Sequence, residues 1–219
     1  MPFSPVAEPL RSNACRRRGR ARMNRRQTPL LLLGALLLSA CTSGPAARLY
    51  VLEPVAGTAG VVPVGDYDAL GVAAVTLPGY ARDPRVATRS DLNRLYMEDQ
   101  QRWAESPEDA ITRVFAERLR YHADATVLVE PFPRGYAPDA RVEVNFDRLL
   151  RTPKGGVDLA GQITLLAGDG RSVLSVRPFR LVRTSESTSF ESYFLTVSKA
   201  VDDLARMAVA RLIESRSPA

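Results

Sequence analysis

The sequence predicts an α+β fold in which two helices pack on a mixed, largely antiparallel sheet. Apolar residues recur at helical spacing in two stretches, 106–122 and 190–212, and short alternating segments typical of strands precede and separate them. Strands and helices are therefore partly segregated along the chain, which favours a layer of helices on one sheet. We expect residues 48–216 to form a single globular domain.

The first strands are short and loops separate them. The apolar, β-branched residues before Pro78-Gly79 indicate a buried strand, whereas 55–66 carries the glycines and prolines of a loop. Residues 90–93 are turn-prone and join two strands. Four strands are expected before the first helix, at 48–53, 69–77, 85–89 and 94–99.

The first helix begins after Ser106, which is a good N-cap. Pro107 suits the first helical position, and Asp109 places a carboxylate near the positive end of the helix dipole. A strand at 126–130 and a proline-rich loop at 131–138 follow. One face of the helix carries the apolar side chains and the stem of Arg118: Ile111, Val114, Phe115 and Leu119.

The next segment predicts an antiparallel meander with a turn at 153–156. Apolar residues alternate with polar ones up to a hairpin signal at 168–170. On the return strand Phe179 and Leu181 are one residue out of phase, and Pro178 lies at the change, so we expect a bulge or a sheet edge there. The in-phase residues are Val142, Val144, Phe146, Val157, Leu159, Gly161, Ile163, Leu165, Leu174 and Val176.

The last element is a long amphipathic helix. Seven in-step apolar residues also fit a coiled coil, but the pattern favours a helix laid on the sheet. The apolar stripe is Phe190, Phe194, Val197, Val201, Leu204, Ala208 and Leu212. The opposite face, expected to meet solvent, holds Lys199, Asp202, Asp203 and Arg206.

The charge of the chain is concentrated at its front. The formal charge is +6, from 30 basic and 24 acidic residues, but residues 1–40 hold eight arginines and one acidic residue. The remaining 22 basic and 23 acidic residues give the body a charge of −1. Residues 41–219 therefore carry no excess of positive charge that could bind the phosphate backbone of a nucleic acid. Nucleic acid is not an expected partner.

Residues 23–40 have the parts of a secretory signal peptide. Arg25 and Arg26 precede an apolar run, 30–38, that is too short to span a bilayer, which needs about 20 residues. The string Leu38-Ser39-Ala40-Cys41 resembles a bacterial lipobox, in which the cysteine is acylated and the chain is cut before it. The alternative is an ordinary cysteine beside an ordinary signal peptide.

Lipidation of Cys41 would anchor the mature protein to a membrane by its acyl chains. Residues 41–47 would then be the lipidated cysteine and its tether. Thr42, in place of aspartate, favours the outer membrane by the sorting rule of enterobacterial lipoproteins, so we expect a location on its periplasmic face in a Gram-negative bacterium. Residues 1–22 precede a complete signal, and translation is expected to begin at Met23.

No catalytic constellation stands out, so an enzyme is not expected. His122 is the only histidine and has no companion for a metal or nucleophile site. Neither Asp66 with Asp68 nor Asp202 with Asp203 fits a calcium loop or a pair of converging carboxylates. The glycine-rich turns lack the lysine or helix start of a phosphate loop. No cofactor or metal is expected.

The stretch 75–114 contains a series of specific motifs that its composition alone does not explain. It contains a strand ending in Leu77-Pro78, then Tyr80, Arg89, Asn93, Leu95 and Arg102-Trp103-Ala104-Glu105 before a helix. Tyr50-Val51-Leu52 and Asn145-Phe146-Asp147 extend the same pattern. Over 49–212 this pattern resembles the PqiC-like auxiliary lipoproteins of MCE-type ABC lipid transporters. Asp83-Pro84-Arg85-Val86 replaces the family's commoner Arg-Pro-Gln-Ile.

The resemblance implies a periplasmic component of an envelope lipid-transport system, in which MCE-domain proteins form hydrophobic tunnels. Such a lipoprotein would dock at the far end of the tunnel, and we expect a homo-oligomer that carries no lipid through its core. The alternative is a structural or regulatory lipoprotein that binds a peptidoglycan-synthesis enzyme or another envelope complex. An operon with an ABC ATPase, a permease and an MCE gene would favour transport.

Four residues are candidates for binding a partner. Arg102 and Trp103 belong to the residue types that anchor protein interfaces. Phe132 and Tyr136 lie in the loop 131–138, which we expect to be exposed. For the first pair the alternative is structural, with Trp103 packed under the start of the helix and Arg102 paired locally.

Overall fold

The computed structural model describes residues 46–56, 60–65 and 67–215. The predicted signal peptide, start at Met23 and lipidated Cys41 lie outside these residues and stay predictions. In chain order the elements are β1 (Arg48–Tyr50), β2 (Ala69–Val72), the 3₁₀ helix η1 (Gly79–Ala81), β3 (Arg85–Arg89), β4 (Leu95–Trp103), α2 (Pro107–His122), β5 (Thr126–Val129), β6 (Ala140–Arg151), β7 (Val157–Ala167), β8 (Val173–Arg183) and α3 (Phe190–Glu214).

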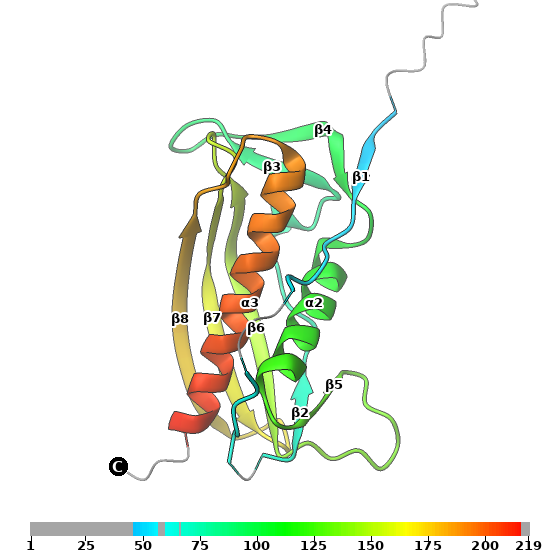
Figure 1. Cartoon of the computed structure of the whole chain (residues 1–219), viewed down its shortest axis with the longest axis vertical. Helices are drawn as coiled ribbons and strands as arrows, with labels where there is room; N and C mark the ends of the chain where they lie inside the picture. Colours follow the sequence, from blue (N-terminus) through cyan, green and yellow to red (C-terminus); the bar gives the residue numbers. More distant parts are fainter. Residues whose placement is uncertain (1–45, 57–59, 66, 216–219) are drawn as a thin grey trace, which may run out of the picture. The chain divides into compact units, whose positions relative to one another are not determined.

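The α+β prediction is confirmed. In the described part of the chain, eight strands form one open, mixed sheet, and both helices lie on the same face of the β6–β8 strands (Figure 1). No helix within the described ranges is long and apolar enough to cross a membrane.

β6 is the central strand of the sheet. One of its edges pairs with β7, and the other pairs with β2 near Ala140 and with β3 at Arg151. β5 extends the sheet beyond β2, while β4 and β1 extend it beyond β3. The longest ladders, β6–β7 and β7–β8, are antiparallel, whereas β1–β4, β2–β5 and β2–β6 are short and parallel.

The meander has the predicted alternation in β6 and β7 but not in β8. Leu174 and Val176, expected in the core, are 43% and 44% exposed, whereas Phe179 is buried and Leu181 packs against the core. The register shift falls at Leu174 and not at Pro178, and it reverses the phase. Pro178 is tolerated because β8 is an edge strand that pairs only with β7, which was the other expectation.

Three early strands differ in length from the prediction. β1 ends at Tyr50, three residues before the expected end. β2 ends at Val72, although Val75 and Leu77 remain buried, and Thr76 makes an isolated bridge to Asn145. β4 continues to Trp103, because its end pairs with β1 as well as with β3. These bounds depend on partners elsewhere in the chain.

The helices begin at serine N-caps. The Ser106 hydroxyl accepts a hydrogen bond from the N–H of Asp109 at 3.4 Å, and the Ser189 hydroxyl accepts one from Ser192 at 3.1 Å. Asp202 corrects the predicted solvent face of α3, since it is 3% exposed and contacts Arg118 of α2. The buried arc of α3 is wider than its apolar stripe because α3 packs on α2 as well as on the sheet.

Candidate functional site

The motif residues Tyr50 and Trp103, 53 positions apart in sequence, are neighbours in the fold. They are register partners in the parallel β1–β4 pair. Phe194 of α3 lies against both rings: its centroid is 4.9 Å from that of Tyr50, in a stacked arrangement, and 4.7 Å from that of Trp103, edge to face. The sheet edge and the start of α3 are therefore joined by one aromatic cluster.

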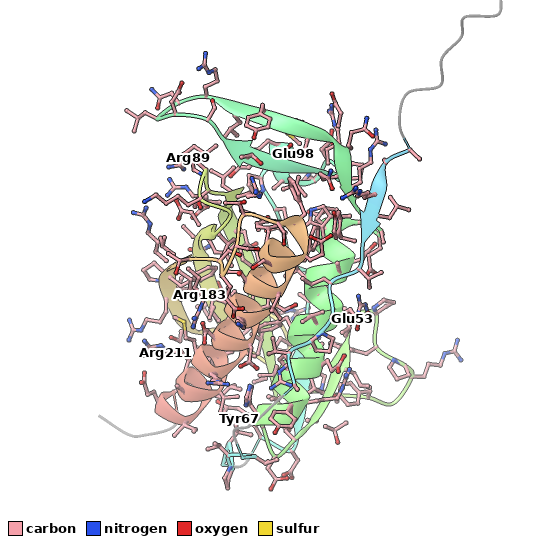
Figure 2. All side chains as sticks on the ribbon, turned by 45° about the horizontal axis from the view of Figure 1, so that its top comes forward. Glu53, Tyr67, Arg89, Glu98, Arg183 and Arg211 are labelled. Atoms are coloured by element: carbon pink, nitrogen blue, oxygen red, sulfur yellow. The ribbon has the colours of Figure 1, made fainter. Side chains whose placement is uncertain are left out.

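A cleft of about 300 Å³ opens beside this cluster, between the segment that follows β1 and the first turns of α3. Apolar side chains are exposed at it, with Val51 51% and Leu195 44% accessible. Figure 2 shows Glu53 on the segment that leaves β1, and the hydroxyl of Ser198 donates a hydrogen bond to the Glu53 carbonyl. The lining residues are Tyr50, Val51, Glu53, Pro54, Glu191, Phe194, Leu195 and Ser198.

The Tyr50 hydroxyl and the Glu191 carboxylate lie at one edge of this cleft. The Tyr50 hydroxyl donates to Gln101 Oε1 at 2.8 Å, and its pKa is raised by burial and by the negative charge of Glu191. The pKa of Glu191 is lowered, first by its own backbone N–H at the start of α3 and then by the Ser189 hydroxyl. The cleft thus combines exposed apolar side chains with the carboxylate of Glu191 and the neutral hydroxyl of Tyr50.

Arg102 and Trp103, predicted together as interface anchors, separate in the structure. Trp103 is 5% exposed and belongs to the core. Arg102 is exposed, and its Nε donates to the Asp99 carbonyl at 3.3 Å. Trp103 therefore shapes the cleft from behind by supporting Phe194, while Arg102 remains available at the surface of β4.

Phe132 and Tyr136 are half-buried and hold their loop against the sheet. A Cβ on Gly71 of β2 would lie 2.5 Å from Phe132, so this ring rests directly on the glycine. The Tyr136 hydroxyl lies 2.8 Å from the Leu70 carbonyl oxygen and 3.0 Å from that of Thr126, within donating distance of both. This loop is far from the aromatic cluster in the fold (Figure 1).

A buried charge cluster joins the helices, and sequence reasoning missed it. Asp202 Oδ1 accepts hydrogen bonds from Arg118 Nε at 2.5 Å and from His122 Nε2 at 2.7 Å. Its Oδ2 pairs with Arg206 at 2.6 Å. Arg118 and His122 stand four residues apart on α2, which is the one sequence signal that they share a face. Within the described ranges, no group of three or more His, Cys, Asp or Glu residues could hold a metal ion.

A family model described as ABC-type transport auxiliary lipoprotein component matches residues 50–209. The chain belongs to this family of transport auxiliary lipoproteins. The match begins at Tyr50 and spans the aromatic cluster, the cleft, all of α2, and α3 as far as Val209. It confirms the resemblance carried by the motifs at Tyr50 and around Trp103.

Solved structures show the same fold. A Xanthomonas campestris protein of the DUF330 family has a TM-score of 0.64 at 16% identity, over 77% of this chain and 96% of that one. A second, uncharacterized protein has a TM-score of 0.62 at 14% identity, over 76% of this chain and 99% of that one. At these identities the likeness concerns the fold alone. No curated protein matches the auxiliary lipoprotein.

Proposed function

We propose that this auxiliary lipoprotein is anchored by acyl chains on Cys41 in the outer membrane, facing the periplasm, and docks an MCE-domain protein of an ABC lipid transporter. It acts as a non-enzymatic docking subunit and carries no lipid in its core. The observation that carries the proposal is the apolar cleft between β1 and α3, whose exposed Val51 and Leu195 have no role in the core.

The place of the cleft in the sequence supports a docking role near the membrane. Residues 42–47 separate the proposed anchor from β1, and six residues reach at most about 20 Å when extended. Since β1 forms one wall of the cleft, the cleft would stay within a short distance of the membrane surface. A tunnel that ends at the outer membrane would meet it there.

The packing of the core favours docking over lipid carriage. The space between the helices and the sheet is filled by fully buried side chains, among them Tyr193, Leu159, Leu204 and Phe115. A hollow at the surface, such as the cleft of about 300 Å³, matches the low end of small-ligand sites and is small for a two-chain phospholipid. A close-packed core leaves few voids larger than water.

A docking subunit with a small contact surface gains from repetition. We propose a homo-oligomer, since several copies in a symmetric ring would present several clefts to a ring of MCE subunits. Linked weak contacts of this kind raise the overall affinity without any new contact.

Two matched arginine substitutions on α3 test the docking site. Leu195, at the cleft, and Ile213, near the other end of the same helix, are 44% and 40% exposed. Leu195→Arg should reduce co-purification of the untagged lipoprotein with a tagged MCE-domain protein from solubilised membranes by about tenfold, because it places a charge in an apolar contact. Ile213→Arg should leave recovery unchanged. Equal recovery for both variants, or equal loss, would contradict docking through the cleft.

A further inference from the structure

Three arginines surround the buried carboxylate of Asp158 on the face of the sheet opposite the helices, since its neighbours Val157 and Leu159 point into the core. Asp158 of β7 is 5% exposed. Its carboxylate oxygens lie 3.6 Å from Arg89 Nη2, 3.4 Å from Arg148 Nη1 and 3.5 Å from Arg180 Nε. The cluster, of which Figure 2 labels Arg89, thus sets three positive charges against one negative charge.

Most N–H groups of these arginines are unused. A single hydrogen bond joins the cluster, from Arg148 Nη1 to Asp158 Oδ2 at 3.4 Å. Within the described part of the chain, the guanidinium groups of Arg89 and Arg180 donate no hydrogen bond. Close guanidinium–carboxylate pairs lie at about 2.7–2.9 Å, so these contacts are loose. Each guanidinium carries five donors in a planar fork that suits an oxyanion.

The strand register builds a shallow site between two of the arginines. Arg148 pairs with Ala160 across β6–β7, and Ala160 pairs with Arg180 across β7–β8. Adjacent strands lie about 4.8 Å apart, so the two arginines flank a gap of roughly two strand spacings with only a methyl group as its floor. The side chains of Arg89, Arg148 and Arg180 are 29%, 35% and 63% exposed, which makes Arg180 the open wall.

Tyr80 adds a neutral donor next to this site. Its hydroxyl oxygen accepts a hydrogen bond from the Leu149 N–H at 3.4 Å, which leaves its own hydrogen free to donate. Burial raises the pKa of Tyr80, which also feels the charges of Arg148, Arg89 and Asp158, and the group stays protonated at neutral pH. Tyr80 and Arg89 both carry the family resemblance, yet the docking cleft uses neither.

We propose that Arg89, Arg148 and Arg180 bind a protonated phosphate group, either inorganic phosphate or the phosphate monoester of a lipid headgroup. One carboxylate oxygen of Asp158 remains free to accept a hydrogen bond, and it selects the protonated form of the phosphate. Asp158 Oδ1 is buried and accepts no hydrogen bond from the described residues. A phosphate with one P–OH donates to that oxygen while its other oxygens accept from the arginines, whereas sulfate only accepts. Arg180 turns outward to admit it. The site does not depend on the docking role.

Calorimetric titration of the full-length protein in detergent, at constant ionic strength, tests the site. Inorganic phosphate should bind saturably and at least tenfold more tightly than sulfate. Glycerol 3-phosphate, the headgroup of phosphatidic acid, distinguishes the sources: tighter binding than inorganic phosphate indicates a lipid headgroup, and weaker binding indicates free phosphate. Either order supports the site. Sulfate binding as tight as phosphate binding, or no saturable binding, would overturn it.

Two arginines of β8 provide a matched pair of variants. Arg180 faces the cluster, whereas Arg177 is exposed on the opposite face of the same strand, opposite Ile163. Arg180→Gln should weaken phosphate binding about tenfold or more, since it removes a charged donor. Arg177→Gln should leave affinity unchanged, and Tyr80→Phe should weaken it by less than Arg180→Gln. Circular dichroism confirms that each variant is folded. An unchanged affinity in Arg180→Gln would contradict the assignment.

Discussion

Asp202 is a buried charged residue whose partners cannot be recognised from the sequence. On a helical wheel it belongs with Lys199 and Asp203 on the polar face of α3, and its two partners on α2 lie 84 and 80 residues away. His122 has no companion in the sequence around it, because its partner Asp202 lies on the other helix. The carboxylate accepts from Arg118 and His122, and Arg118 also donates to the Val55 carbonyl at 3.0 Å.

Removing the charge of Asp202 should destabilise the fold. Asp202→Asn leaves the Arg118 guanidinium, 95% buried as a side chain, without its counter-charge. Breaking a buried ion pair in this way costs about 3–5 kcal/mol. Urea unfolding followed by circular dichroism should show a loss of that size in the free energy of unfolding.

The neighbouring acid provides the control for this measurement. Asp203 pairs with Arg183, whose side chain is 42% exposed and which Figure 2 labels beside α3. Because exposed pairs contribute about 1 kcal/mol or less, Asp203→Asn should be nearly neutral. Equal losses of unfolding free energy in the two variants would contradict the prediction that the buried Asp202 ion pair contributes more stability than the exposed Asp203 pair.

The same cluster should make stability depend on pH at the acid end. Burial opposes ionisation of Asp202, but the hydrogen bonds from His122 and Arg118 outweigh it, and its pKa is lowered in the folded state. A lowered folded-state pKa contributes stability above the unfolded value of about 3.9, and this contribution is lost as the pH falls through the folded value. Unfolding free energies should therefore fall below about pH 4.

The Asp202→Asn variant isolates that contribution. It lacks the titrating carboxylate, so its free energy of unfolding should fall less steeply over the same acid range than that of the wild type. Parallel curves for the two proteins would assign the acid sensitivity to other carboxylates.

Among the helices and strands, features that depend on neighbouring residues in the sequence were predicted well. Features that depend on a partner strand were not. Ser106 and Pro107 mark the start of α2 through the chain's own hydrogen bonds, so the sequence shows it. The phase of β8 depends on an extra residue, Leu174, that is accommodated only by pairing with β7. The candidate cleft has the same limit: Tyr50 and Trp103 were visible as motif residues, but their contact requires β1 to pair with β4.

The β6–β7 ladder depends on a close backbone approach at Gly161. A Cβ at this position would lie 2.1 Å from the Asn145 carbonyl oxygen, near the register shift between Phe146 and Arg148. Gly161→Ala must push two central strands apart and should lower stability by about 1–3 kcal/mol or more. Gly79→Ala has nothing within 4 Å of the new Cβ and serves as the control in thermal unfolding. Equal melting temperatures for the two variants would contradict this packing.

At the scale of the whole molecule, the docking cleft and the proposed phosphate site lie on different elements. The proposed anchor at Cys41 and the cleft are joined by a short tether, and the close-packed core lies between the helices and the sheet. The phosphate site proposed on the uncovered face of the sheet is separate from the cleft, since it uses β3, β6, β7 and β8. Docking at one surface therefore leaves the other free.

Native mass spectrometry of the full-length protein in detergent tests whether the lipoprotein docks a partner or carries lipid. The protein is measured with added phospholipid and, separately, with an MCE-domain protein. We expect a homo-oligomer that forms a complex with the MCE-domain protein and retains no phospholipid beyond the acyl chains proposed on Cys41. A monomer that retains one phospholipid per chain and forms no complex would contradict docking and indicate a lipid carrier.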